Sequence, residues 1–318
     1  MLAERLPRTA RLTVSVVVPT KDRAPLLAQA ARRLLEQTAL VDELIVVDQS
    51  QTDAGRDGVV EALAAAPPER RPALRYVRDP AIPGAAAARN VGLDLAAMDV
   101  VVCMDDDMAP APDALERILA HYARDPGIAA ITPVITNYPP PPLLRRIFTA
   151  VFCRGPLRDD RQPVYWHWRR HARSPLVPVR VLGAGMLTVR RAALGDVRFD
   201  SRYRGASLGE DIDLSWSLVR RGARLAIATD AHVVHARPPR PAMRHEAAML
   251  TSWGFVFDKH QPRTLRNRLA FAWFVTGLAL GALAASCRSR SSAPLESLRE
   301  GLAQRRRDYA GSRFLAPR

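Results

Sequence analysis

Lysine and cysteine are both scarce in this sequence. Lys21 and Lys259 are the only lysines among 47 basic residues, so arginine carries almost all of the positive charge. The three cysteines, Cys103, Cys153 and Cys287, lie far apart and form no CxxC pair. This pattern argues against a zinc site or a disulfide framework, and it fits a reducing compartment.

No export signal is visible at the start of the chain. After a basic lead over residues 1–12, the apolar run Val14–Val18 is too short for a signal peptide and stops at Pro19. We therefore expect the protein to stay in the cytoplasm. Its formal net charge of +15 would attract anions, whether nucleotides, nucleic acid or an anionic lipid surface.

Short apolar runs alternate with helix-like stretches through the first two thirds of the chain. Runs rich in Val and Ile, typical of strands buried in a parallel sheet, occupy residues 12–18, 44–47 and 100–104. Further strands are predicted at 128–134, 181–189 and 225–227, and helices at 24–37, 59–66, 85–97, 115–123 and 212–221. The alternation predicts an α/β fold, a doubly wound and mostly parallel sheet with flanking helices, over residues 13–235.

Ligands of such sheets sit outside the carboxyl ends of the strands, and this rule places segments 19–23, 48–53 and 105–107 along one rim. Asp105, Asp106 and Asp107 follow a predicted buried strand. Three adjacent carboxylates repel one another, and a hard cation such as Mg²⁺ or Mn²⁺ would relieve the repulsion. A solvated acidic turn or a helix cap is the alternative. The position at a strand end favours the metal.

A second acidic cluster, Glu210-Asp211-Ile212-Asp213, opens a predicted helix. Carboxylates are stabilised at a helix N-terminus, so an ordinary capping cluster is one reading of this segment. The other is that one carboxylate acts as a general base and deprotonates an acceptor hydroxyl. The spacing alone does not separate the two.

Several short motifs follow one another in order between Val14 and His235. They are VVPTKDR at 17–23, VVDQS at 46–50, GAAAARNVG at 84–92, DDD at 105–107, GAGM at 183–186, ED at 210–211, and a histidine at 235. Each motif is a weak signal, but the ordered set resembles the family-2 glycosyltransferases of the GT-A fold. The resemblance covers most of the chain and implies transfer of a sugar from a nucleotide-diphosphate donor.

The resemblance also implies roles for individual residues. Asp211 would be the catalytic base, with Glu210 beside it, and Asp107 and His235 would hold a divalent cation, Mn²⁺ or Mg²⁺. Gly185 and Met186 would lie on the acceptor side. The donor would be bound by Pro19, Thr20, Arg23, Asp48, Arg89, Asn90, Asp105 and Asp106.

Two departures from the family pattern refine this reading. Gln49 occupies a position after the strand where many relatives have a second Asp. This difference affects which base or sugar of the donor the protein recognises. The Gln-x-x-Arg-Trp motif of processive synthases is absent from the sequence, so we expect single sugar addition. The alternatives are a nucleotidyltransferase, although segment 14–23 lacks that class's glycine-rich loop, and an inactive glycosyltransferase-like scaffold. We expect no nucleic-acid partner, because the arginines are scattered and the acidic rim would repel phosphate.

Residues 138–180 form a long excursion rich in proline, arginine and aromatic residues. Trp166 and Trp168 lie within its basic part, where indole rings could stack on an acceptor sugar or sit at a membrane interface. A local hydrophobic cluster that pins the excursion is the simpler alternative.

From residue 236 to residue 318 the composition changes, and we expect a basic, helical appendage. Its apolar segment, residues 269–286, is flanked by arginines on both sides. A spanning helix normally has asymmetric flanking charge, so a helix lying in an anionic membrane interface is favoured over a spanning or a buried one. The family resemblance implies an inverting, metal-dependent enzyme. Together with the appendage it predicts an enzyme at the cytoplasmic face of the cell membrane, acting on a lipid-linked or cell-surface glycan precursor.

Overall fold

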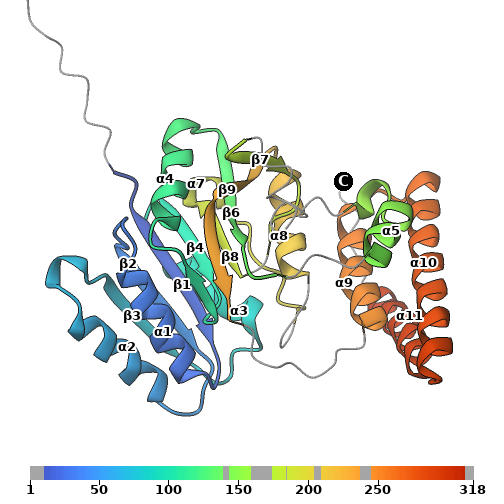
Figure 1. The fold of residues 1–318 in the computed structure, drawn as a ribbon, viewed down its shortest axis with the longest axis horizontal. Helices are drawn as coiled ribbons and strands as arrows, with labels where there is room; N and C mark the ends of the chain where they lie inside the picture. Colours follow the sequence, from blue (N-terminus) through green and yellow to red (C-terminus); the bar gives the residue numbers. More distant parts are fainter. Residues whose placement is uncertain are drawn as a thin grey trace, which may run out of the picture.

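A computed structural model gives the fold, an α/β sheet domain beside a bundle of helices (Figure 1). The structure describes residues 11–138, 143–158, 174–183, 185–203, 209–236 and 245–311. The sheet has the strand order β3-β2-β1-β4-β8-β6-β9-β5, and β7 pairs with β9. The predicted α/β architecture is therefore confirmed.

Four parallel strands form the first half of the sheet: β1 (Val14–Thr20), β2 (Glu43–Asp48), β3 (Ala73–Arg78) and β4 (Val100–Met104). Every residue of β1, β2 and β4 is buried, as their continuous apolar sequences predict. The connecting helices are α1 (Ala24–Leu35), α2 (Ala54–Ala65) and α3 (Ala85–Leu95). The chain first builds outward from β1 to β2 and β3, then returns to place β4 on the other side of β1. This reversal creates a switch point between the carboxyl ends of β1 and β4.

The second half of the sheet is mixed. β8 (Met186–Arg190) runs antiparallel to both β4 and β6 (Ile128–Ile135), whereas β9 (Arg224–His235) runs parallel to β6. The start of β9 pairs with β7 (Leu176–Val179) and its end with β5 (Met108–Pro110). Because β5 follows the Asp triplet directly, this pairing brings the end of β9 to the rim.

The predicted strand over 181–189 is shorter than expected. β8 begins only at Met186, because Gly185 takes a φ of 96° that an extended strand does not allow. A Cβ on Gly185 would approach Met108 Sδ to 2.8 Å, so the position needs glycine for space as well as for conformation. Three short helices complete the domain: α4 (Ala114–Arg124), α7 (Arg191–Leu194) and α8 (Glu210–Val219).

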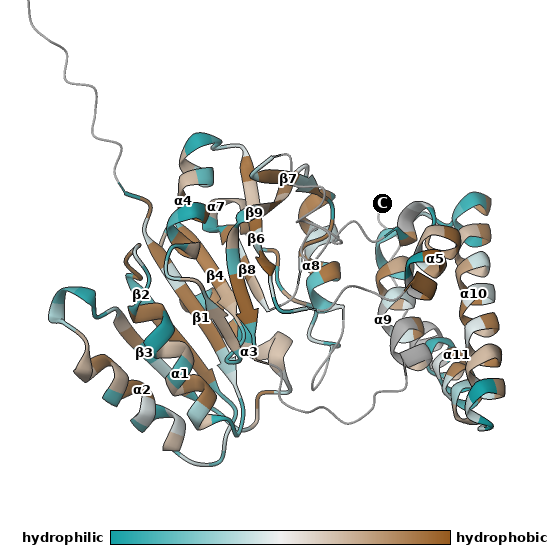
Figure 2. Cartoon of the chain, viewed as in Figure 1, coloured by the Kyte–Doolittle hydropathy of each residue, from teal (hydrophilic) through white to brown (hydrophobic). Residues whose placement is uncertain are grey.

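A second hydrophobic core lies in the helical bundle. It is formed by α9 (His245–His260), α10 (Leu265–Ser289) and α11 (Ala293–Gly311), with α5 (Leu143–Phe152) and the 3-10 turn Gly155–Leu157 packed among them. Figure 2 shows hydrophobic residues along the sheet strands and also on α5. The excursion after residue 138 therefore contributes a helix to the appendage, which sequence reasoning did not anticipate.

The bundle is packed onto the sheet domain. Val181 and Ile212, which belong to the sheet domain by sequence, are buried in the second core. Among the described residues, α10 is the one helix long and apolar enough to cross a membrane by length and composition, with a mean hydropathy of 1.8.

Candidate active site

The carboxyl ends of β1, β2 and β4 meet at one rim, as predicted. The backbone N–H of Gln49 donates to the Thr20 carbonyl at 2.9 Å, and the N–H of Asp22 donates to Ser50 Oγ at 2.7 Å. Thr20 Oγ1 donates to Asp106 Oδ2 at 2.7 Å, which ties the end of β1 to the segment after β4. The switch point is thus lined by polar groups held by short hydrogen bonds.

Asp106 and Asp107 are buried and share one arginine. Arg23 Nη1 lies 2.9 Å from Asp106 Oδ1 and 3.2 Å from Asp107 Oδ2. Burial raises the pKa of Asp106 above its ordinary value, and the hydrogen bonds from Thr20 and Arg23 offset only part of that rise. One guanidinium therefore contacts both carboxylates of this pair.

Asp105 faces a different arginine. Arg89 Nη2 lies 2.5 Å from Asp105 Oδ1, and Arg89 Nη1 pairs with Glu210 at the start of α8. Burial alone would lower the pKa of Arg89, but the two carboxylates outweigh burial and raise it, so the guanidinium stays charged. Arg89 therefore bridges the Asp triplet and α8, the two acidic motifs found in the sequence.

His235 reaches the rim from the end of β9. Its Cα pairs with that of Met108 in the β5–β9 ladder, and the N–H of Ala236 donates to the Asp107 carbonyl at 2.8 Å. His235 Nδ1 lies 2.5 Å from Tyr138 Oη, and Nε2 lies 3.1 Å from Asp107 Oδ1. Nε2 is buried and, within the described part of the chain, makes no hydrogen bond. The ring thus turns a buried nitrogen toward a buried carboxylate.

We call Thr20, Arg23, Asp106, Asp107 and His235 the rim cluster. A divalent cation fits it, because a buried histidine nitrogen with no hydrogen bond beside a carboxylate is a pair of potential ligands. Tyr138 would orient the imidazole from its other nitrogen. The described residues include no group of three or more His, Cys, Asp or Glu side chains placed to hold a metal. Two protein ligands are nevertheless enough for Mg²⁺ or Mn²⁺, which take their other ligands from phosphate and water.

Asp211 lies in the first turn of α8, next to Glu210. Gly209 precedes the helix with a φ of 100°, a left-handed conformation that favours glycine. Asp211 Oδ1 accepts a hydrogen bond from the N–H of Ile212 at 2.9 Å, and Ser215 Oγ donates to the Asp211 carbonyl. Asp211 therefore has a fixed position in the first turn of α8, next to Glu210, which pairs with Arg89.

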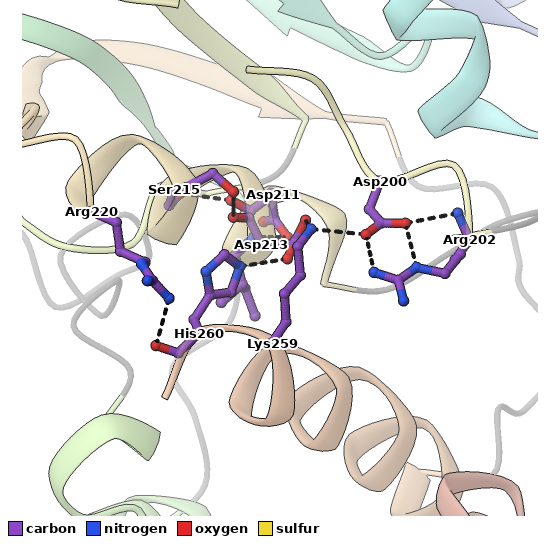
Figure 3. Close-up of polar contacts among 10 residues, drawn as sticks. Asp200, Arg202, Asp211, Asp213, Ser215, Arg220, Lys259 and His260 are labelled. Atoms are coloured by element: carbon purple, nitrogen blue, oxygen red, sulfur yellow. Dashed lines mark hydrogen bonds and ion pairs between the residues drawn. The ribbon is translucent and has the colours of Figure 1, made fainter. Parts of the chain in front are cut away.

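Asp213, two residues further on, faces the appendage instead (Figure 3). Its two oxygens lie 2.7 Å from Lys259 Nζ and 2.7 Å from His260 Nε2, both at the end of α9. Lys259 also pairs with Asp200 at 2.8 Å, and Asp200 pairs with Arg202. We call Asp200, Asp213, Lys259 and His260 the seam cluster. Sequence reasoning did not anticipate these pairings, because the partners are far apart in the chain.

Several residues predicted to bind the donor are already engaged by the fold. Asp48 is buried and accepts hydrogen bonds from Tyr76 Oη at 2.5 Å and from the N–H of Ser50. The Asn90 side chain bonds both the N–H and the carbonyl of Phe199, and so braces α3 against that segment. These contacts hold both side chains in place, and the predicted nucleotide contacts remain predictions.

The remaining predicted residues differ in their placement. Pro19 lies within β1 and pairs with Val47 of β2. The Gly185 carbonyl accepts a hydrogen bond from the N–H of Asp105 at 2.8 Å, at the edge of the rim cluster. Met186 is buried in the core of the sheet, and its place on the acceptor side stays a prediction. Trp166 and Trp168 lie outside the described residues.

Comparison with known proteins identifies relatives of this chain. The family model described as glycosyl transferase family 2 matches residues 15–193. A pre-mycofactocin glycosyltransferase of Mycobacterium tuberculosis is 28% identical over 84% of this chain and 53% of its own length. A validoxylamine A glucosyltransferase of Streptomyces hygroscopicus is 26% identical over 78% of this chain and 61% of its own length. The chain thus spans just over half the length of these curated relatives.

Solved structures share the fold. A mannosyltransferase from Pyrobaculum calidifontis, in complex with GDP-Man and Mn²⁺, superimposes with a TM-score of 0.61 and 18% identity, over 94% of this chain and 88% of that one. Glucosyl-3-phosphoglycerate synthase from Mycobacterium tuberculosis, in complex with Mg²⁺ and UDP, has a TM-score of 0.53 and 20% identity, over 80% of this chain and 82% of that one. These matches confirm the predicted GT-A type fold.

Proposed function

Because this chain belongs to glycosyl transferase family 2, we propose that it transfers one sugar from a nucleotide-diphosphate donor to an acceptor hydroxyl, with inversion at the anomeric carbon. The observation that carries the proposal is the rim cluster. There the buried Nε2 of His235 faces Asp107, and Arg23 contacts both Asp107 and the neighbouring Asp106. Family membership favours glycosyl transfer over nucleotidyl transfer, the alternative enzyme class.

We propose Asp107 and His235 as the protein ligands of a divalent cation, Mn²⁺ or Mg²⁺. When bound, such an ion would offset the charge on the donor diphosphate and stabilise it as a leaving group. Both relatives of known structure named above hold a nucleotide or nucleotide sugar together with Mn²⁺ or Mg²⁺, which supports this choice. Arg23 and Thr20 would keep the neighbouring Asp106 in place.

Asp211 is the proposed general base. Its carboxylate would take the proton of the acceptor hydroxyl as the hydroxyl oxygen forms a bond to the anomeric carbon from the face opposite the leaving group. The bond from that carbon to the diphosphate oxygen breaks in the same step, which inverts the configuration. Arg89, paired with Asp105 and Glu210, would hold α8 at a fixed distance from the donor.

The acceptor we propose is a lipid-linked or cell-surface glycan precursor, met at the cytoplasmic face of the cell membrane. The apolar helix α10 in the appendage supports this location. The appendage contacts α8 directly, so an acceptor held near α10 would lie on the side of the enzyme that carries Asp211.

Calorimetric binding of UDP, GDP and dTDP, each with and without Mn²⁺, tests the donor site in the wild type and in Asp107→Ala. We expect one nucleotide to bind in a metal-dependent way and the variant to lose that binding. Asp125→Ala, which removes an exposed carboxylate paired with Arg224, is the matched control and should bind like the wild type. Absence of binding for all three nucleotides at millimolar concentration would leave the inactive scaffold as the better reading.

A further inference from the structure

An exposed apolar face runs across α5 and α10. Nine of the eleven large hydrophobic side chains that are exposed in the described chain lie on these two helices. They are Leu143, Leu144, Ile147, Val151, Leu265, Leu269, Trp273, Leu280 and Leu283. So strong a concentration on one part of the surface is unusual for a soluble protein and indicates an interaction site.

The two helices form one continuous face. The rings of Phe152 and Trp273 lie 5.1 Å apart between centroids, and Trp273 Nε1 donates to the Val151 carbonyl at 2.9 Å. Phe148 packs edge-on against Phe274 at 6.3 Å. The excursion and the appendage therefore present their apolar side chains together.

The buried side of α10 argues against a helix that crosses the bilayer. Phe271, Phe274, Leu278 and Ala282 are buried in the second core. Arg305 of α11 lies 3.6 Å above the Phe271 ring and pairs with Asp258. If α10 crossed the membrane, it would either leave this core or carry the charged helix α11 into hydrocarbon. A helix half sunk in the interface keeps the core intact.

The charge around the face is of one sign. Neither α5 nor α10 contains an acidic residue. Exposed arginines lie at both ends of α10, at Arg266, Arg268 and Arg288, and on α5 at Arg146. An apolar stripe flanked by arginines complements the hydrocarbon boundary and the negative headgroups of an anionic bilayer.

A basic hollow of about 430 Å³ opens at the N-terminal end of α10. Its lining carries no acidic side chain among the described residues and consists of Gly155, Arg158, Arg180, Trp216, Gln261, Arg266 and Asn267. Arg266 belongs both to this hollow and to the first turn of α10, next to the exposed Leu265. Trp216 lies five residues after Asp211 on α8, which is about 7.5 Å along the helix axis. The hollow therefore adjoins the apolar face through Arg266 and helix α8 through Trp216.

We propose that α5 and α10 dock the enzyme in the plane of an anionic bilayer, and that Arg158, Arg180 and Arg266 bind the phosphate of a lipid acceptor at its edge. Arginine recognises phosphate through charge and paired N–H donors. The docking surface stands on its own evidence, whereas the acceptor part rests on the function proposed above. Such a lipid would keep its apolar chain against α10 while its phosphate lies in the hollow beside Trp216 of α8.

Vesicle flotation with the full chain tests the docking surface. We expect binding to vesicles of phosphatidylcholine and phosphatidylglycerol in equal parts, weaker binding to phosphatidylcholine alone, and release at high salt.

Leu269→Gln with Leu283→Gln should weaken binding at least tenfold, since each leucine buries its side chain in the interface. Val60→Gln, at an exposed hydrophobic residue of α2 that lies outside this face, is the control and should bind normally. Equal binding by both variants would overturn the docking surface, and retention through an alkaline carbonate wash would mean that α10 spans.

Calorimetry with water-soluble probes tests the basic hollow. Octyl phosphate should bind more tightly than both octanol and inorganic phosphate, and Arg266→Gln should weaken its binding about tenfold. Arg306→Gln, at an exposed arginine of α11, should leave it unchanged. Equal affinity for octyl phosphate and inorganic phosphate would identify a site for free phosphate and overturn the lipid assignment. These measurements need no sugar donor, so their failure is distinguishable from loss of metal-dependent nucleotide binding.

Discussion

The rim cluster and the seam cluster both contain buried charged side chains, but they differ in how far hydrogen bonds within the described chain satisfy them. In the seam cluster, each oxygen of Asp213 has a cationic or imidazole nitrogen at 2.7 Å, so the charge is matched within the fold. In the rim cluster, Arg23 contacts both Asp106 and Asp107, and the buried Nε2 of His235 makes no hydrogen bond in the described chain. A cluster whose polar atoms are paired within the fold holds the structure together, whereas a cluster with a buried nitrogen that lacks a hydrogen bond is suited to a ligand.

The sharpest test of this contrast uses two aspartates on the same helix. Asp211→Asn should lower the rate of sugar transfer by a factor of about 10²–10⁴, because a general base contributes that much. Donor binding and the free energy of unfolding should remain close to those of the wild type. Initial-rate kinetics and calorimetry with the donor nucleotide would measure both effects. A wild-type rate would remove Asp211 from the mechanism.

Asp213→Asn should act on stability instead. Removing one partner from a fully buried ion pair costs about 3–5 kcal/mol, and we expect about 2–3 kcal/mol here because Lys259 keeps Asp200. Urea unfolding gives the value. Asp125→Asn, in an exposed pair with Arg224, should cost less than about 1 kcal/mol. If both variants lost the same free energy of unfolding, the ion pairs of Asp213 would contribute no more than an exposed ion pair does.

Tyr138→Phe probes the rim cluster through the histidine that Tyr138 orients. We expect the affinity for Mn²⁺, titrated in the presence of the donor nucleotide, to fall about 10–100-fold because the imidazole loses its outer hydrogen bond. Tyr122→Phe removes a similar bond to Thr188, on the other side of the sheet, and should leave Mn²⁺ affinity unchanged. Equal affinities in all three proteins would mean that His235 is not a ligand.

The pH dependence of stability should have opposite signs in the two clusters. Burial alone would raise the pKa of Asp200, but hydrogen bonds from Arg202 and Lys259 hold it well below its ordinary value. Asp200 therefore stabilises the fold above about pH 4, and this contribution is lost as the pH falls. The raised pKa of Asp106 means that its ionisation, above about pH 4, opposes folding.

Urea unfolding over a pH series would compare two variants with the wild type. Asp200→Asn should be less stable at neutral pH and should converge with the wild type in acid. Asp106→Asn should gain stability relative to the wild type as the pH rises. The same sign of pH dependence for both variants would contradict the distinction between the clusters.

The sequence predicts the rim better than its surroundings. Asp107 lies shortly after a buried strand, and strand ends in such sheets converge on one edge, so local patterns were enough to place it at the rim. His235 was assigned to the site only through the family resemblance, because the predicted strand 225–227 stops short of this residue. The edge strand β3 was missed because its alternating exposure gives no continuous apolar run. The seam cluster was missed for a different reason, since Asp213 and Lys259 meet only through the packing of two helices.

The packing of α5 among the C-terminal helices has a consequence for how the chain can be cut and how it folds. The contact between Trp273 and Val151 joins residues 122 positions apart in the sequence. The second core therefore closes only after most of the polypeptide has been synthesised, and loops of such length close slowly. A chain ended near residue 236 would leave Phe148 and Phe152 without their partners on α10, and such exposed aromatic surface promotes aggregation. A gene fusion or deletion with its break near residue 236 would therefore not yield two parts that each keep an intact core.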